Sequence, residues 1–149
     1  MAQATEFLIN LRHITKLHEL CLRDICSRYH LTMMEATIIG FLKNNPGLDT
    51  AADIVELRML SKGHVSQAVE SLIQKSLLSR TVDPEDRRRI HLSLLPESNP
   101  VTESLEQIQN VFLEELFDGF TPAERRQFGD FNRRIMENSK KSLEKRRHS

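Results

Sequence analysis

The chain has 149 residues, of which 39% are hydrophobic, and its 21 Lys and Arg balance 21 Asp and Glu to a formal net charge of zero. This length allows one domain with helical extensions and a core that needs neither disulfides nor metal, and it excludes a second catalytic domain. No apolar run approaches the roughly 20 residues of a membrane span, and the N-terminus lacks the pattern of a signal peptide. We therefore expect a cytoplasmic protein that does not bind membranes.

The first predicted element is one amphipathic helix over residues 6–29. Its apolar residues recur every three or four positions, and His18 fills the one missing step. Cys21 and Cys26 lie five residues apart in this helix, a spacing that does not suit a disulfide. The ordinary interpretation is that both cysteines are buried structural residues with free thiols. A peroxide-sensing thiol is the alternative, and it requires a thiolate pKa lowered by nearby cations.

Three shorter helices are predicted next, and the last of them has one polar face. A capping box at Thr32–Glu35 starts the first, over residues 33–44, and the second covers residues 50–58. Ser61 is a good N-cap for the third, because apolar residues recur after it at helical spacing. This arrangement is typical of a helix-turn-helix. The other face of the third helix carries donors and acceptors that suit base edges and phosphates: Lys62, His64, Ser66, Gln67, Ser71 and Gln74.

Two strand-like runs follow, over residues 77–82 and 90–95, on either side of a loop with a basic tip. The loop contains a proline, acidic residues and the consecutive Arg87, Arg88 and Arg89, so we expect it to be exposed, with charges that suit phosphate contacts. Between residues 58 and 91, seven Lys and Arg face four acids, although the whole chain is neutral. The order of helix, hairpin and basic tip predicts a winged helix-turn-helix that binds double-stranded DNA.

Two more long helices are predicted after the hairpin. Ser98–Pro100 opens the first, which ends at Gly119, and a capping box at Thr121–Glu124 starts the second. The apolar stripes of these helices and of the N-terminal helix need a partner surface, which a second copy of the chain supplies most simply. We therefore expect a homodimer that binds a pseudo-palindrome, with half-sites about one turn of DNA apart.

Residues 60–94 resemble the MarR (multiple antibiotic resistance regulator) family of bacterial transcription factors. The wing of that family carries a D-x-R-x-x-x-L pattern, which is met here by Asp86, Arg88 and Leu92. The resemblance implies that Arg88 enters the minor groove and that Asp86 holds it by a charge-assisted hydrogen bond. It also implies a repressor that leaves DNA when a small aromatic or phenolic ligand, or an oxidant, shifts the dimer helices.

The chain departs from the family pattern at two places. Ser76 stands after the recognition helix where the family commonly has glycine, at a position that often needs a left-handed backbone. Residues 95–100, Leu-Pro-Glu-Ser-Asn-Pro, replace the usual link into the next helix. Both departures leave the wing intact, and the second concerns only the path from the wing to the next helix.

The predicted fold is mostly α (α+β), with a winged helix-turn-helix over residues 31–97 and long dimerisation helices over residues 1–30 and 98–149. No cofactor or metal site is expected, because no histidine pair has the spacing of a helix-borne site. An enzyme is disfavoured by the absence of a phosphate loop or a nucleophile motif. The alternatives are a redox-sensing regulator that uses Cys21 or Cys26, and a dimeric interaction module without DNA binding. The predicted DNA-binding residues are Ser61, Lys62, His64, Ser66, Gln67, Asp86, Arg87, Arg88 and Arg89.

Overall fold

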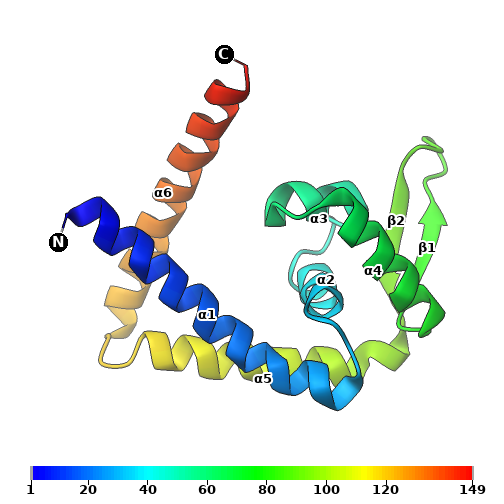
Figure 1. The fold of residues 1–149 in the computed structure, drawn as a ribbon, viewed down its shortest axis with the longest axis horizontal. Coiled ribbons are helices and arrows are strands. Elements are labelled where there is room, and N and C mark those ends of the chain that lie inside the picture. The colour runs from blue at the N-terminus through cyan, green and yellow to red at the C-terminus, as the bar shows by residue number, and fades with distance from the viewer. Residues whose placement is uncertain (1, 149) are drawn as a thin grey trace. The chain divides into compact units, whose positions relative to one another are not determined.

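The computed structural model describes residues 2–148, which form helices and one two-stranded hairpin (Figure 1). The chain divides into two compact units, the first ending at Phe112 and the second beginning at Leu113. The expected mostly helical winged helix with long terminal helices is confirmed. The elements in chain order are α1 (Gln3–Tyr29), α2 (Met33–Asn44), α3 (Ala51–Arg58), α4 (Lys62–Gln74), β1 (Leu78–Val82), β2 (Ile90–Leu94), the 3-10 turn η1 (Pro96–Ser98), α5 (Asn99–Leu116) and α6 (Pro122–Arg147).

Side-chain caps explain where most of these helices begin. Thr32 and Thr121 form the two predicted capping boxes, and Thr50 forms a third at the start of α3. Ser61 accepts a hydrogen bond from the His64 amide at 3.4 Å, as expected of the N-cap of α4. Helix α1 begins three residues earlier than the predicted residue 6, because its first turn is polar and adds nothing to the apolar pattern.

The core of the first unit joins α4 and the hairpin to the rest of the helix-turn-helix. Val65 and Leu72, on the apolar stripe predicted for α4, are 0% exposed. Leu78 of β1 and Leu92 of β2 belong to the same buried cluster. Each such side chain contributes about 1.5–3 kcal/mol on burial, so the apolar stripe decides which face of α4 is turned to solvent.

The hairpin pairs its strands antiparallel, with Leu78 opposite Leu94 and Val82 opposite Ile90. Its strands are one residue shorter than predicted at the end near the body. A backbone hydrogen bond from Leu95 to Leu77 continues the pairing there at 3.0 Å. The segment that departs from the family pattern forms η1 and leads directly into α5.

Ser76 has a φ of 60°, the left-handed conformation that the family's usual glycine adopts without strain. The amide of the next residue, Leu77, donates to the Leu72 carbonyl at 3.0 Å, which satisfies a carbonyl of the last turn of α4. The serine therefore makes the same turn as a glycine, at some conformational cost.

The second unit contains the end of α5 and the whole of α6. Phe117 packs edge-on against Phe128, and the Arg125 guanidinium lies 4.9 Å from the centre of the Phe117 ring. Gly119 has a φ of 81°, which lets the chain turn between the two helices. None of the described residues of α6 is buried.

Both terminal helices leave large apolar side chains exposed in the single chain. On α1 these are Phe7, Leu8, Ile9, Leu11 and Leu20, and on α6 they are Phe128, Phe131, Ile135, Met136 and Leu143. Despite this apolar surface, no helix within residues 2–148 combines the length and hydropathy needed to cross a membrane.

Candidate DNA-binding site

The start of α4 presents polar side chains to solvent. Ser61, Lys62, His64, Ser66 and Gln67 are all exposed, on the cap and first two turns of the helix. Because the apolar stripe of α4 is buried in the core, the polar face of the helix is held toward solvent. The structure therefore gathers the five predicted helix residues of the candidate site on one accessible stretch.

Ser71 does not belong to this exposed face, contrary to the sequence-based expectation. It is half buried, and its hydroxyl donates to Oε2 of Glu35 at 3.0 Å. The residue lies at the edge of the apolar stripe, where the start of α2 covers it. Gln74, also predicted on the polar face, is exposed.

Glu35 is a buried carboxylate that fixes the end of α4 to the start of α2. Its side chain is 2% exposed, and Lys75 Nζ donates to its two oxygens at 3.0 and 2.9 Å. The Thr32 amide donates to Oε1 at 2.9 Å, and Lys75 also donates to the His30 carbonyl at 3.0 Å. Burial alone would raise the pKa of Glu35, but the hydrogen bonds from Thr32, Lys75 and Ser71 outweigh it and lower the pKa.

The Lys75–Glu35 ion pair reduces the positive charge that residues 58–91 can offer to DNA. Lys75 lies after α4 and neutralises Glu35, and Arg80 of β1 forms an ion pair with Glu70 of α4. Lys75 and Arg80 are thus paired with acids away from the wing tip, whereas Arg88, the third paired residue of the seven, contacts Asp86 at the tip itself. The positive charge available to a partner is concentrated at the start of α4 and at the wing tip.

The wing tip presents Arg88 in an extended, solvent-facing position. The side chain of Arg88 is 93% exposed, and Oδ1 of Asp86 accepts from its backbone amide at 3.0 Å and from its Nε at 3.3 Å. An exposed pair of this kind contributes about 0–1 kcal/mol to stability, so its main effect is on where the guanidinium points. Arg87 and Arg89 flank it and are also exposed.

His91, on β2, connects the wing to the helix-turn-helix body. Its Nδ1 lies 2.8 Å from Oδ1 of Asp49, and its Nε2 lies 2.7 Å from Oδ2 of Asp83. The two carboxylates raise the pKa of His91 above its usual 6.5, with Asp49 having the larger effect. Sequence reasoning missed this bridge, because Asp49 and His91 are 42 positions apart and no local pattern links them.

These residues lie within a segment that matches a known family. Residues 30–89, from just before α2 to the wing tip, match the model of the MarR family. The winged-helix region is therefore similar to the MarR family. The match covers the helix-turn-helix and the arginines of the wing, and MarR-family proteins are transcription regulators.

Known relatives extend this similarity over more of the chain. The chain is 24% identical over 115 residues to YsmB of Bacillus subtilis (strain 168), an uncharacterized HTH-type transcriptional regulator, covering 77% of this chain and 78% of YsmB. Its fold is similar to that of Bordetella bronchiseptica BpsR, whose DNA binding is regulated by 6-hydroxynicotinic acid (TM-score 0.67, 22% identity, 88% of this chain and 98% of BpsR). It is also similar to S. aureus MepR in complex with DNA (TM-score 0.68, 18% identity, 93% and 98%). At these identities the structures show the shared fold.

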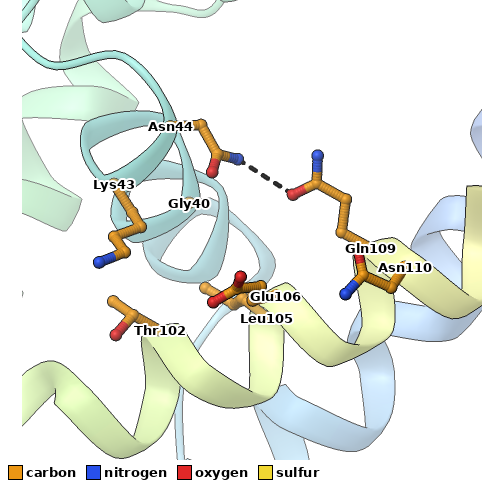
Figure 2. A pocket seen from close by; sticks show the side chains of 8 residues that line it. All are labelled: Gly40, Lys43, Asn44, Thr102, Leu105, Glu106, Gln109 and Asn110. Atoms are coloured by element: carbon orange, nitrogen blue, oxygen red, sulfur yellow. Dashed lines mark hydrogen bonds between the residues drawn. The ribbon is translucent and has the colours of Figure 1, made fainter.

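A polar groove of about 370 Å³ lies between α2 and α5 (Figure 2). Asn44 of α2 donates to the Gln109 side chain of α5 at 3.2 Å across it. Lys43 and Glu106 bring opposite charges to its lining, and Leu105 offers apolar surface. The groove can therefore hold a small polar molecule, with one cation available to an acidic group.

The surroundings of Cys26 differ from what a thiol sensor requires. Cys21 and Cys26 are both free and partly buried, and Sγ of Cys26 lies 3.6 Å from Sδ of Met33. Burial and the nearby Glu35 carboxylate raise the pKa of Cys26, so little of it is thiolate near neutral pH. A peroxide sensor needs the opposite shift, which argues against that role for Cys26.

Proposed function

We propose that the chain is a sequence-specific DNA-binding transcriptional regulator that acts as a homodimer on pseudo-palindromic operators. The observation that carries the proposal is Arg88, held by Asp86 at the exposed tip of the wing. An arginine in this position suits a narrow, electronegative minor groove. Arg87 and Arg89 flank it with charge for the adjacent phosphates.

In this proposal the start of α4 lies in the major groove. Gln67 can form paired hydrogen bonds with adenine, and Lys62 can contact a phosphate or a guanine. Ser61, His64 and Ser66 add donors and acceptors on the same exposed stretch. Residues 31–97 form the DNA-binding region.

The terminal helices support a homodimer. Helices α1 and α6 both expose several large apolar side chains, which a monomer would leave in water. A second copy would bury them without any other partner, and a two-fold axis would pair two recognition helices on DNA. Residues 1–30 and 98–149 form the dimerisation region in this proposal.

We further propose that a small ligand releases the protein from its operator and so relieves repression. Among proteins of this fold, the DNA binding of BpsR is regulated by a small molecule, 6-hydroxynicotinic acid. A small aromatic or phenolic acid would suit the groove of Figure 2, with its ring against Leu105 and its acidic group near Lys43. Such a ligand acts only if its affinity differs between the DNA-bound and free conformations.

The test is selection of preferred sequences from a random duplex library, followed by binding to the winner at several salt concentrations. We expect an enriched palindrome whose affinity falls steeply with salt. Arg88→Ala should weaken binding, whereas Arg12→Ala, which removes the same charge from an exposed position on α1, should not, provided that its oligomeric state matches that of the wild type. Enrichment of no sequence would favour a dimeric interaction module instead.

A further inference from the structure

A continuous series of hydrogen bonds connects the helix-turn-helix body to the arginine at the wing tip. It begins at Asp49, in the loop before α3, and passes through His91 to Asp83 at the end of β1. Oδ1 of Asp83 accepts from the amides of Glu85 at 2.8 Å and Asp86 at 3.0 Å. Asp86 in turn holds Arg88. We call the Asp49–His91–Asp83 contacts the His91 bridge.

The geometry of the His91 bridge requires a protonated imidazole. A neutral imidazole has one N–H donor and one acceptor nitrogen, and an ionised carboxylate only accepts. Both ring nitrogens lie within 2.8 Å of a carboxylate oxygen, so a neutral His91 would place its lone pair against one of them. Only the imidazolium donates to both. Loss of the proton would break one of the two contacts.

The bridge is also well placed to act on the wing. The Leu92 amide donates to the Asp49 carbonyl at 2.8 Å, which joins β2 to the body by its backbone next to His91. Beyond this point the hairpin projects outward to Val82 and Ile90, which are exposed. The side chain of His91 therefore supplies a second attachment just where the free part of the wing begins.

The charges around His91 favour its protonation. Thr81, its partner across the hairpin, is neutral. The hydrogen bonds from His91 and from the amides of Glu85 and Asp86 lower the pKa of Asp83 to about 2, which keeps that carboxylate ionised. Charged side chains lie on both elements around His91. On the body these are Lys43 and Asp49, which line one shallow groove. On the hairpin they are Arg80, Asp83, Glu85, Asp86, Arg87, Arg88 and Arg89.

We propose that protonated His91 is a positioning residue for DNA binding, which ties the wing to the body so that specific affinity falls when its imidazole loses the proton. This inference rests on the proposed function. Its direction follows from linkage. The His91 bridge is fully formed at pH values below the ordinary pKa of 6.5, and it is lost as the pH rises through the higher pKa of His91 in the folded protein.

The test compares DNA affinity between pH 6 and 8.5 for the wild type and two variants. His91→Gln keeps the size and neutral hydrogen bonding of the side chain, and Asp49→Asn removes the carboxylate on the body side. Asp83 is avoided, because its loss would also open the wing turn. We expect both variants to bind about tenfold more weakly at pH 6, toward the lower end of the range for a single DNA contact, and to lose part of the wild-type pH dependence.

Two further histidine variants separate this effect from others. His64 lies on the recognition helix and is itself proposed to contact DNA, so its loss should weaken binding by a separate route. His64→Gln should therefore keep the component of the pH dependence that His91→Gln removes. His13→Gln, at an exposed histidine of α1, is the matched control; because α1 lies in the proposed dimerisation region, its oligomeric state is checked by size-exclusion chromatography, and a variant with the wild-type oligomeric state should retain the wild-type pH profile. Unchanged pH profiles in His91→Gln and Asp49→Asn would overturn the inference.

A measurement without DNA tests the bridge itself. Nitrogen chemical shifts of the His91 ring should show both nitrogens protonated at pH 6.5 and a titration at higher pH, which Asp49→Asn moves downward. Titration of His91 at or below 6.5 in the wild type would overturn the inference. If the wild type binds its operator through Arg88 but His91→Gln has the wild-type profile, only this inference fails. If the wild type selects no DNA, the proposed function fails and the DNA-binding role of His91 fails with it.

Discussion

Lys75→Met should destabilise the protein by leaving a buried carboxylate without its cation. Removing one partner of a buried ion pair typically costs about 3–5 kcal/mol. Lys75 is itself 38% exposed, so water can reach the vacated side of Glu35 and reduce the cost. Glu35 also keeps its hydrogen bonds from Thr32 and Ser71. We therefore expect a loss of about 2–3 kcal/mol in the free energy of unfolding, below the range for a fully buried pair.

The double variant Glu35→Gln/Lys75→Met distinguishes this explanation from a simple loss of packing. The amide oxygen can still accept from the Thr32 amide, its NH2 group can donate to the Ser71 hydroxyl, and no buried charge is left uncompensated. We expect the double variant to be more stable than Lys75→Met by about 1–2 kcal/mol, in the lower part of the roughly 1–3 kcal/mol range for an unsatisfied buried group, because Glu35 keeps two of its hydrogen bonds in the single variant. If charge compensation were unimportant, the second substitution would instead add to the first.

Equilibrium unfolding in urea, followed by far-UV circular dichroism, measures these differences. All variants must be compared at one protein concentration, because the stability of the proposed dimer would depend on it. The pKa of Glu35 is lowered in the folded protein, so its contribution to stability is present above the ordinary 4.5 and is lost as pH falls through the folded value. In Lys75→Met, burial would instead favour protonation of Glu35. The stability difference from the wild type should therefore shrink below about pH 4.5, and a constant difference from pH 7 to pH 4 would refute the reasoning.

Three other predictions concern the wing, the turn after α4 and the buried thiol. Asp86→Asn should weaken operator binding by less than the roughly 1–3 kcal/mol expected for Arg88→Ala, because it frees the arginine without removing it; fluorescence anisotropy measures both, and the reverse order would contradict the positioning role. Ser76→Gly should raise the free energy of unfolding by about 0.5–1 kcal/mol, because glycine adopts the left-handed backbone without strain; a less stable variant in urea would show that the serine side chain matters. Cys26 should react with a maleimide more slowly in the folded than in the urea-unfolded protein at pH 7, because burial raises its pKa, and equal rates would argue otherwise.

Local sequence patterns were sufficient to predict most of the secondary structure. Thr32 and Thr121 start their helices as expected, and the apolar stripe of α4 is buried as its spacing indicates. The hydrogen bond between Asp86 and Arg88 is also present where the family resemblance places it. Caps, turns and adjacent contacts depend on residues a few positions apart, so a single sequence contains the information needed to infer them.

Contacts between distant segments could not be predicted in the same way. Lys75 was counted as charge for DNA, yet it pairs with Glu35, 40 positions earlier. His91 showed no pattern at all, although it contacts a residue 42 positions before it. Periodicity indicates which face of an element is buried, but not which side chain from another element meets it. Ser71 illustrates the limit, because a polar residue at the edge of a stripe is assigned to solvent unless its partner is known.

The location of the Glu35 contact has a consequence for redesigning specificity. Helix α4 has 13 residues, and the side chains proposed to touch DNA occupy its beginning, whereas Lys75 holds its far end. At 1.5 Å per residue, roughly 18–20 Å separates the two ends. Lys62, Ser66 and Gln67 can thus be exchanged as a set without disturbing the attachment of the helix. A library randomised at these positions would explore new operator sequences on an unchanged scaffold.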